Sequence, residues 1–246
     1  DYVLVFTTGV LLDGDEEDAD SGSIELNINP NETMACMDIN GIQRFIPIIR
    51  NGNRGVIKIG AITADLFKDD QNTELTVPAL PGMNAYTVEI PAEHLRQGES
   101  SLTIRTSIGS IVIPADLLSN QGDVNGKTVT ISITSVDKST LPEDVRIAVG
   151  NRPVLQINVA IDGETISWNN PNAPVMISIP FVPTQEELGD PESIVVWYID
   201  SNDQIIVVPN GNYNPDAKAV TCITTHLSIF AVAYDDVVFE DVPKDS

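Results

Sequence analysis

Apolar and polar residues alternate over short runs through most of this chain. In "GKTVTISITSV", Val129, Ile131 and Ile133 alternate with threonine and serine. Successive side chains of a β-strand point to opposite faces, so a period of two predicts strands with one buried face. Similar β-rich runs predict strands at "DYVLVFTTGVLL", "SIELNIN", "GVIKIGAI", "TELTVPAL", "AYTVEIP", "VLQINVAI", "VMISIPF", "SIVVWYID", "QIIVVP" and "AVTCITTHLSIFAVAY".

Turn residues separate these predicted strands. "SLTIRTSIGSIVIPADLL" predicts a tight hairpin that turns at Gly109-Ser110. Further turns are predicted at Asp162-Gly163, Asn202-Asp203 and Asn210-Gly211. Strands that recur at short intervals with such turns are typical of a sandwich. We therefore expect a mainly β fold with an antiparallel β-sandwich in the C-terminal half.

Residues 32–51 have a different spacing, which predicts a minor α/β part near the N-terminus. We expect an interrupted helix there, weakened by Gly41 and ended near Pro47 or Gly52. Its apolar residues lie three or four positions apart for most of the run: Met34, Met37, Ile39, Ile42, Phe45 and Ile49. Shorter helical turns are predicted at "TADLFKDD", with Thr63 as N-cap, and at "PAEHLRQG".

The length of 246 residues suits one large all-β domain or two smaller domains. We place a boundary near Asn120, within "LLSNQG". It divides a mixed α/β or β-rich domain over residues 1–120 from a β-sandwich domain over residues 121–236.

The charge of the chain narrows the class of partner. Acidic residues outnumber basic ones 36 to 13, which gives a formal net charge of -23. Such a surface repels phosphate backbones and anionic membranes, so nucleic acid is not an expected partner. No run approaches the ~20 apolar residues that span a bilayer, so we expect no direct membrane insertion. The composition suits a solvated extracellular protein, or one whose repulsion is screened by salt or divalent cations. Solubility alone is an equal alternative explanation.

The two cysteines, Cys36 and Cys222, lie far apart in the sequence and belong to no CxxC motif. Both have apolar neighbours, and we expect free, buried thiols. A disulfide between them remains an open alternative.

The sequence contains none of the common catalytic motifs, such as GxSxG, HExxH, a Walker loop or GxGxxG. His94 lies beside Glu93 and near Arg96, which predicts a solvated side chain on a short helix. The many carboxylates leave open a pair for glycoside hydrolysis, but they single out no residues. We expect no enzyme activity.

An acidic loop is the one candidate metal site. Asp13, Asp15 and Glu17 have the alternating spacing of a calcium loop. An EF-hand is excluded, because Asp18 stands where glycine belongs and Ile24 where glutamate belongs. We predict no cofactor, and calcium in this loop is the one alternative. "DVNGK" at residues 123–127 is read as an Asn-Gly turn.

Two adjacent aromatic residues, Trp197 and Tyr198, are a candidate sugar platform. Neighbouring residues on a strand face opposite sides, so only one of the two can easily join the core. The other is expected at the rim or an interface. Polysaccharide therefore remains an alternative partner.

From about Leu75 to Tyr234 the chain resembles a module common in Gram-positive surface proteins. The matching stretches include "YTVEIPAEHL", "LTIRTSIGSIVIPADLL", "LPEDVRIAVGNRPVLQINVAIDG" and "TTHLSIFAVAY". The final "VVFEDVPKDS" resembles the opening of an S-layer homology (SLH) module, so residues 237–246 are expected to be its start or a linker to it. The resemblance implies a non-catalytic β-rich domain next to modules that bind cell-wall polysaccharide. It implies an extracellular location, in the cell wall or S-layer, and partners among neighbouring surface components.

A second likeness concerns "THLSIFAV". Together with the hairpin at "TSIGSIVIPADLL", it resembles the paired domains of ankyrins and netrin receptors, and also the autoproteolytic domain of adhesion receptors. The receptor resemblance implies His226 as general base, Ser228 as nucleophile and Leu227 as the residue that supplies the scissile carbonyl. Self-cleavage at Leu227-Ser228 needs a strained turn and a histidine within hydrogen-bond reach of the hydroxyl.

The residues around this motif favour a structural role. "CITTHLSIFAVAY" is rich in β-branched and aromatic residues and has no glycine to make a kink. We expect one buried strand with His226 and Ser228 on the same face. The predicted function is a non-catalytic spacer or adhesive scaffold of an S-layer-type protein. A polysaccharide-binding module is the alternative, and a self-cleaving domain a lesser one.

Overall fold

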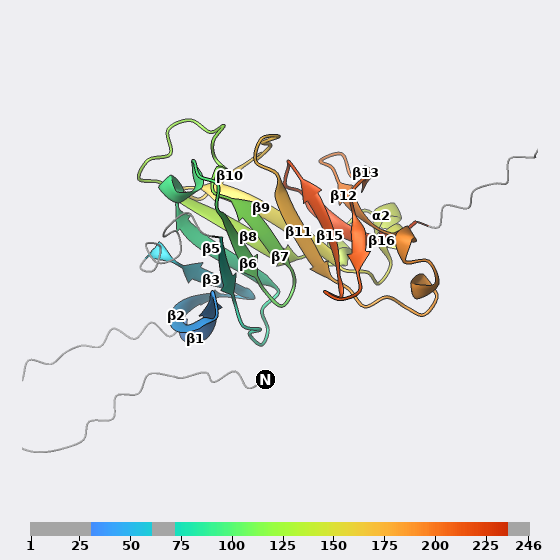
Figure 1. Ribbon diagram of the computed structural model, residues 1–246. Helices are drawn as coiled ribbons and strands as arrows, with labels where there is room; N and C mark the ends of the chain where they lie inside the picture. The colour runs from blue at the N-terminus through green and yellow to red at the C-terminus, as the bar shows by residue number, and fades with distance from the viewer. Residues whose placement is uncertain (1–30, 61–71, 236–246) are drawn as a thin grey trace, which may run out of the picture.

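The structure is a computed structural model that describes residues 31–60 and 72–235. Strands dominate these residues, which confirms the predicted β-rich fold (Figure 1). In the described part of the chain, sixteen strands form one hydrogen-bonded sheet. The order along it is β13-β12-β16-β9-β8-β5-β3-β2-β1-β4-β6-β7-β11-β15-β14, and β10 pairs with β9.

The helix predicted over residues 32–51 is wrong. These residues form a hairpin of β1 (Glu32–Ile39) and β2 (Ile42–Asn51), in which Ile39 lies opposite Ile42. Asn40 and Gly41 make the two-residue turn, with φ of 51° and 81°. Asn-Gly is the pair that tolerates positive φ at both turn positions, so it fixes the hairpin.

The true apolar pattern of this hairpin has a period of two. In β1 the buried side chains are Ala35, Met37 and Ile39, whereas Ile42 and Phe45 in β2 are more than half exposed. The wider spacing came from counting exposed residues as core. Pro47 lies within β2 opposite Met34 and ends no helix.

The rest of the first half follows the alternating pattern. The short helix predicted at "PAEHLRQG" is a 3-10 turn over Ala92–Leu95. The turn predicted at "TADLFKDD" lies outside the described residues, as do "DYVLVFTTGVLL" and "SIELNIN". The strands are β3 (Arg54–Lys58), β4 (Thr73–Thr76), β5 (Ala85–Pro91), β6 (Ser101–Arg105) and β7 (Ser110–Pro114).

In the second half, the pattern missed one helix, α2 (Glu143–Val149), which begins after Pro142 and ends at Gly150. Three 3-10 turns span Lys138–Thr140, Glu187–Gly189 and Pro191–Ser193. The strands are β8 (Thr128–Ser135), β9 (Val154–Ile161), β10 (Glu164–Ile166), β11 (Val175–Pro180), β12 (Ile194–Ile199), β13 (Ile205–Val208), β14 (Asn212–Asn214), β15 (Ala219–Thr224) and β16 (Ile229–Tyr234).

Strand pairing crosses the boundary predicted near residue 120. Strand β8 pairs with β5, and β11 pairs with β7. The sheet is mixed rather than purely antiparallel, because β3–β5 and β4–β6 are parallel pairs. Both sides of the boundary therefore contribute to one sheet, and the two-domain division stays a prediction.

Distant parts of the sheet lie against each other at the β6–β7 turn. A Cβ atom on Gly109 would meet the side chains of Leu155 on β9 and Ile133 on β8. The predicted hairpin is present, but its loop is residues 106–109, and Ser110 already belongs to β7. The turn of the β6–β7 hairpin therefore packs against β8 and β9. The sandwich arrangement itself stays a prediction.

Buried aliphatic side chains from both halves form one large core, and a smaller cluster lies beneath α2. In the small cluster, Val145 and Val149 pack with Ala231 of β16. In Figure 1 the β1–β2 hairpin lies at one end of the molecule and β12, β13 and β16 lie at the other.

Candidate functional site

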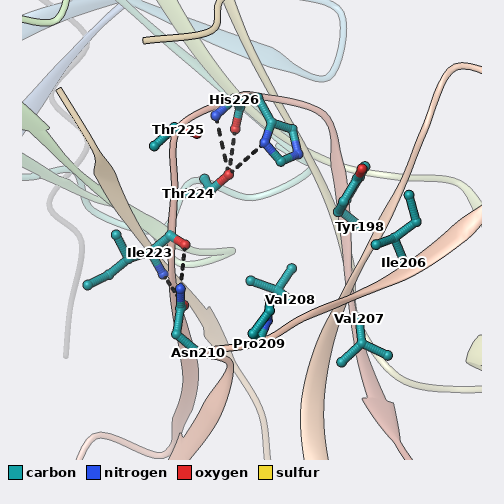
Figure 2. A pocket seen from close by; sticks show the side chains of 10 residues that line it. All are labelled: Tyr198, Ile206, Val207, Val208, Pro209, Asn210, Ile223, Thr224, Thr225 and His226. Carbon is teal, nitrogen blue, oxygen red and sulfur yellow. Dashed lines mark hydrogen bonds between the residues drawn. The ribbon is translucent and has the colours of Figure 1, made fainter. Parts of the chain in front are cut away.

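A cavity of about 450 Å³ opens between β13 and the end of β15. Strand β12 contributes Tyr198, β13 and the next residues contribute 206–210, and the opposite wall is residues 223–226. Figure 2 shows His226 at the top, with Tyr198 and Ile206 on one side and Asn210 below. The lining is mostly apolar, with a few polar groups, which is the usual character of a binding groove.

The chain turns sharply at Thr224, so the single strand predicted through "CITTHLSIFAVAY" is wrong. Strand β15 ends at Thr224 and β16 begins at Ile229. The Thr224 hydroxyl accepts from the His226 N–H at 3.3 Å and donates to the His226 carbonyl at 3.0 Å. A threonine hydroxyl that bonds its own backbone makes a turn without glycine.

The His226 ring is held by this turn and by aromatic neighbours. Its Nδ1 lies 3.1 Å from the Thr224 hydroxyl, and its ring centroid is 4.5 Å from that of Tyr198. Phe230 lies behind, at 6.2 Å between centroids. Burial lowers the pKa of His226, because an apolar setting disfavours the charged ring. Its Nε2 is buried and has no hydrogen-bond partner among the described residues.

The structure places His226, Leu227 and Ser228 in one turn, but the His226 ring and the Ser228 hydroxyl have different hydrogen-bond partners. The Ser228 hydroxyl donates to the Ile199 carbonyl on β12 at 2.6 Å. Among the described residues, no hydrogen bond joins the His226 ring to that hydroxyl. A general base must reach the proton that it removes, whereas here the Ser228 hydroxyl proton is donated to the Ile199 carbonyl.

Asn210 closes the lower wall of the cavity. Its side-chain amide donates to the Ile223 carbonyl at 2.9 Å, and its carbonyl accepts from the Ile223 N–H at 2.7 Å. The side chain thus pairs with the edge of β15 as a neighbouring strand would. Next to it, a Cβ on Gly211 would lie 2.7 Å from the Val196 backbone nitrogen, so only glycine fits where the chain crosses β12.

The aromatic pair does not form an open platform. Trp197 and Tyr198 are both half-buried, Trp197 against the cluster beneath α2 and Tyr198 against the main core. The structure thus differs from the expectation of one core residue and one residue at the rim or an interface, since neither ring is fully buried and neither is exposed. Their opposite directions on β12 place each against a different cluster.

The acidic loop with Asp13, Asp15 and Glu17 lies outside the described residues. In residues 31–60 and 72–235, no group of three histidine, cysteine or acidic residues could hold a metal ion. The calcium alternative therefore stays a prediction.

The cysteines are free, as expected. Cys222 is buried, and burial raises the pKa of its thiol to about 12, so it stays protonated. Cys36 is half-buried rather than buried, and its Sγ donates to Oε1 of Gln43 at 2.8 Å.

A second cavity, of about 370 Å³, has a charged pair in its wall. The Arg152 guanidinium contacts the Glu187 carboxylate at 2.9 Å through both Nε and Nη2. Burial alone would raise the pKa of Glu187, but hydrogen bonds from Thr184 and Arg152 outweigh it and lower that pKa. Because the two charged groups already bind each other, we interpret the pair as a structural ion pair rather than a ligand site.

The sequence singled out His226 and Ser228 but predicted one strand through them, and so it missed the turn. Thr224 was read as one strand residue among others, although Thr-Thr before histidine offers hydroxyls that can bond the backbone. Asn210-Gly211 was identified as a turn, but the pairing of Asn210 with β15 is a tertiary contact that no local pattern encodes.

No protein-family model matches the chain, and no curated protein matches it. The resemblance to surface-layer proteins therefore rests on the quoted sequence stretches. No helix among the described residues is both long and apolar enough to cross a membrane.

Proposed function

We propose that this chain is a non-catalytic spacer and interaction region of an extracellular surface-layer-type protein of a Gram-positive bacterium, held next to cell-wall anchoring modules. The proposal joins the resemblance of residues 75–246 with the net charge of -23, which keeps a surface solvated. Its partners are neighbouring surface-layer or cell-wall components.

The observation that supports this proposal best is the continuity of the sheet. Every strand of the described chain belongs to one hydrogen-bonded network, and the early strands β5 and β7 pair with the later β8 and β11. A network of this kind must lose many backbone hydrogen bonds together before it opens. That cooperativity suits a module that separates other parts of a protein outside the cell.

The turn at residues 224–228 supports the non-catalytic part. The Ser228 hydroxyl is committed to the Ile199 carbonyl, and the His226 ring to Thr224. A polysaccharide platform needs exposed aromatic faces, and Trp197 and Tyr198 are half-buried. Neither alternative has an observation in its favour, so we propose neither.

Location is tested with antibodies raised against this chain, applied to the cells that produce it. We expect labelling of intact cells and loss of the label after brief external protease treatment. An antibody against a cytosolic enzyme of the same cells is the control and should label only after lysis. Signal that appears only after lysis would contradict the proposal.

The absence of self-cleavage is tested by intact mass of the purified chain and of Ser228→Ala. We expect both to be uncut after prolonged incubation at neutral pH. A released peptide of residues 228–246 from the unchanged chain, missing in Ser228→Ala, would show self-cleavage and overturn the non-catalytic assignment.

A further inference from the structure

Strand β13 (Ile205–Val208) is an unusually apolar edge for a sheet. It ends the path of paired strands and pairs only with β12, whereas the opposite end is β14, which is three residues long and has asparagine at both ends. Ile205, Ile206 and Val207 are 36%, 37% and 44% exposed, and no charged residue interrupts them. Native proteins usually blunt an exposed edge, because its backbone groups can pair with another chain.

The neighbouring edge shows how this protein blunts a strand. Beyond the stretch where β14 covers β15, the Asn210 side chain bonds both backbone groups of Ile223. No side chain in the described residues does the same for β13. The outer backbone groups of β13 therefore lack the side-chain hydrogen bonds that Asn210 gives to β15.

The open edge runs along the cavity described above. Ile206 and Val208 lie opposite Tyr198 and Val196 of β12, so they face the groove together with Tyr198, and His226 forms its far end (Figure 2). A strand paired with β13 would place every second side chain into this groove. Backbone pairing supplies affinity and the groove supplies selectivity in such strand addition.

Charge indicates which kind of segment fits. The turn before β13 contains Asp200 and Asp203, and no lysine or arginine lines the cavity. The Asp200 carboxylate is engaged with the N–H groups of Asn202 and Gln204. Neither aspartate has a salt bridge among the described residues. A cationic partner is favoured here, whereas a second copy of this chain, also at -23, is repelled.

We propose that β13 binds an extended segment of a partner protein by strand addition, with β-branched apolar side chains at alternate positions and lysine or arginine at its C-terminal end. Antiparallel pairing is the more stable arrangement, and it puts the C-terminal end of the segment beside Asp203, at the start of β13. This inference deepens the proposed function, since it gives the interaction region a site and a class of partner.

The test uses the full chain and a blocked synthetic peptide with alternating threonine and valine followed by two lysines. Binding is followed by fluorescence anisotropy, and amide hydrogen exchange is measured with and without peptide. We expect saturable binding and slowed exchange at the amides of residues 205–208. A peptide N-methylated at alternate residues keeps its side chains but cannot pair, and should not bind.

Variants assign the contacts. Ile206→Thr keeps a β-branched residue but removes apolar surface, and should weaken binding about tenfold. Ile42→Thr makes the same change at an exposed apolar residue of β2, at the other end of the molecule in Figure 1, and should leave binding unchanged. A peptide with its two lysines at the amino end should bind the unchanged chain about threefold more weakly, a small effect because exposed ion pairs contribute little. The Asp203→Asn variant should bind both peptides equally.

Three results would overturn the proposal: no binding of the peptide, equal binding of the N-methylated peptide, or protection of amides away from β13. Sedimentation of the chain alone is measured as well. A dimer that Ile206→Thr dissociates would mean that the occupant is a second copy, which also overturns it. Surface labelling of cells does not depend on any of these results, so failure here leaves the proposed function separately testable.

Discussion

Burial of the His226 ring ties its charge to the folded state. The ring lies between the Thr224 hydroxyl and the aromatic rings of Tyr198 and Phe230, where neutral imidazole is favoured and its pKa is lowered. Unfolding exposes the ring to water, where the pKa of a histidine is about 6.5. The unfolded chain therefore binds a proton at His226 more readily than the folded chain does.

The stability that neutral His226 contributes is fully present above its unfolded pKa and is lost as pH falls toward its folded pKa. We expect urea unfolding midpoints to fall between about pH 7.5 and about pH 5.5, and to fall less in His226→Asn. Equal slopes in the two proteins would contradict the assignment.

Asn210 gives a second prediction for a single side chain. Asn210→Ala removes both bonds to Ile223, and we expect a loss of about 1 kcal/mol with faster hydrogen exchange at the Ile223 amide. Asn210→Asp keeps the acceptor for the Ile223 N–H and loses only the donor, so it should protect that amide better than Asn210→Ala. Unchanged exchange in Asn210→Ala would contradict this role.

At the scale of elements, strands could be predicted where one face is buried and the other polar. Strand β8 has that pattern, with Val129, Ile131 and Ile133 buried, and it was identified directly. The hairpin at residues 32–51 was missed because its apolar residues face both ways, and the Asn40-Gly41 turn carried the better signal. The break after Thr224 was missed because a side-chain hydroxyl makes it. Pairing order was out of reach, since it depends on contacts between distant segments.

Close packing of the β6–β7 turn on the β8–β9 face makes Gly109 a sensitive position. Gly109→Ala would drive a methyl group into Leu155, and the Ser178 carbonyl lies only 3.2 Å from the new carbon. We expect a loss of about 1–3 kcal/mol in urea unfolding, as for other overpacked sites. Gly122→Ala, where nothing lies within 4 Å, is the control and should change stability by less than about 0.5 kcal/mol.

At the scale of the molecule, both halves of the described chain contribute to the same sheet and to the same core. Leu102 and Ile104 from the first half share a core cluster with Val175 and Phe230 from the second. The buried Trp168 indole donates to the Leu117 carbonyl at 2.9 Å, across the boundary predicted near residue 120. Unfolding of one half would therefore expose core side chains of the other half and break hydrogen bonds between the two.

We therefore expect one cooperative unfolding transition for the full chain. Tryptophan fluorescence and far-ultraviolet circular dichroism should give the same urea midpoint, as two-state unfolding requires. Separate fragments of residues 1–120 and 121–236 should each lack a cooperative transition. Two separated transitions, or a fragment that unfolds cooperatively by itself, would instead support two domains.

The position of β16 has a consequence for how the chain is made. It is the last described strand, yet it lies between β12 and β9 and pairs with both. Until residues 229–234 leave the ribosome, β12 and β13 have no backbone connection to β9. Partly synthesised chains thus expose two complementary edges, and long-range pairings of this kind form slowly. Completion of the native sheet is therefore coupled to the completion of synthesis through Tyr234.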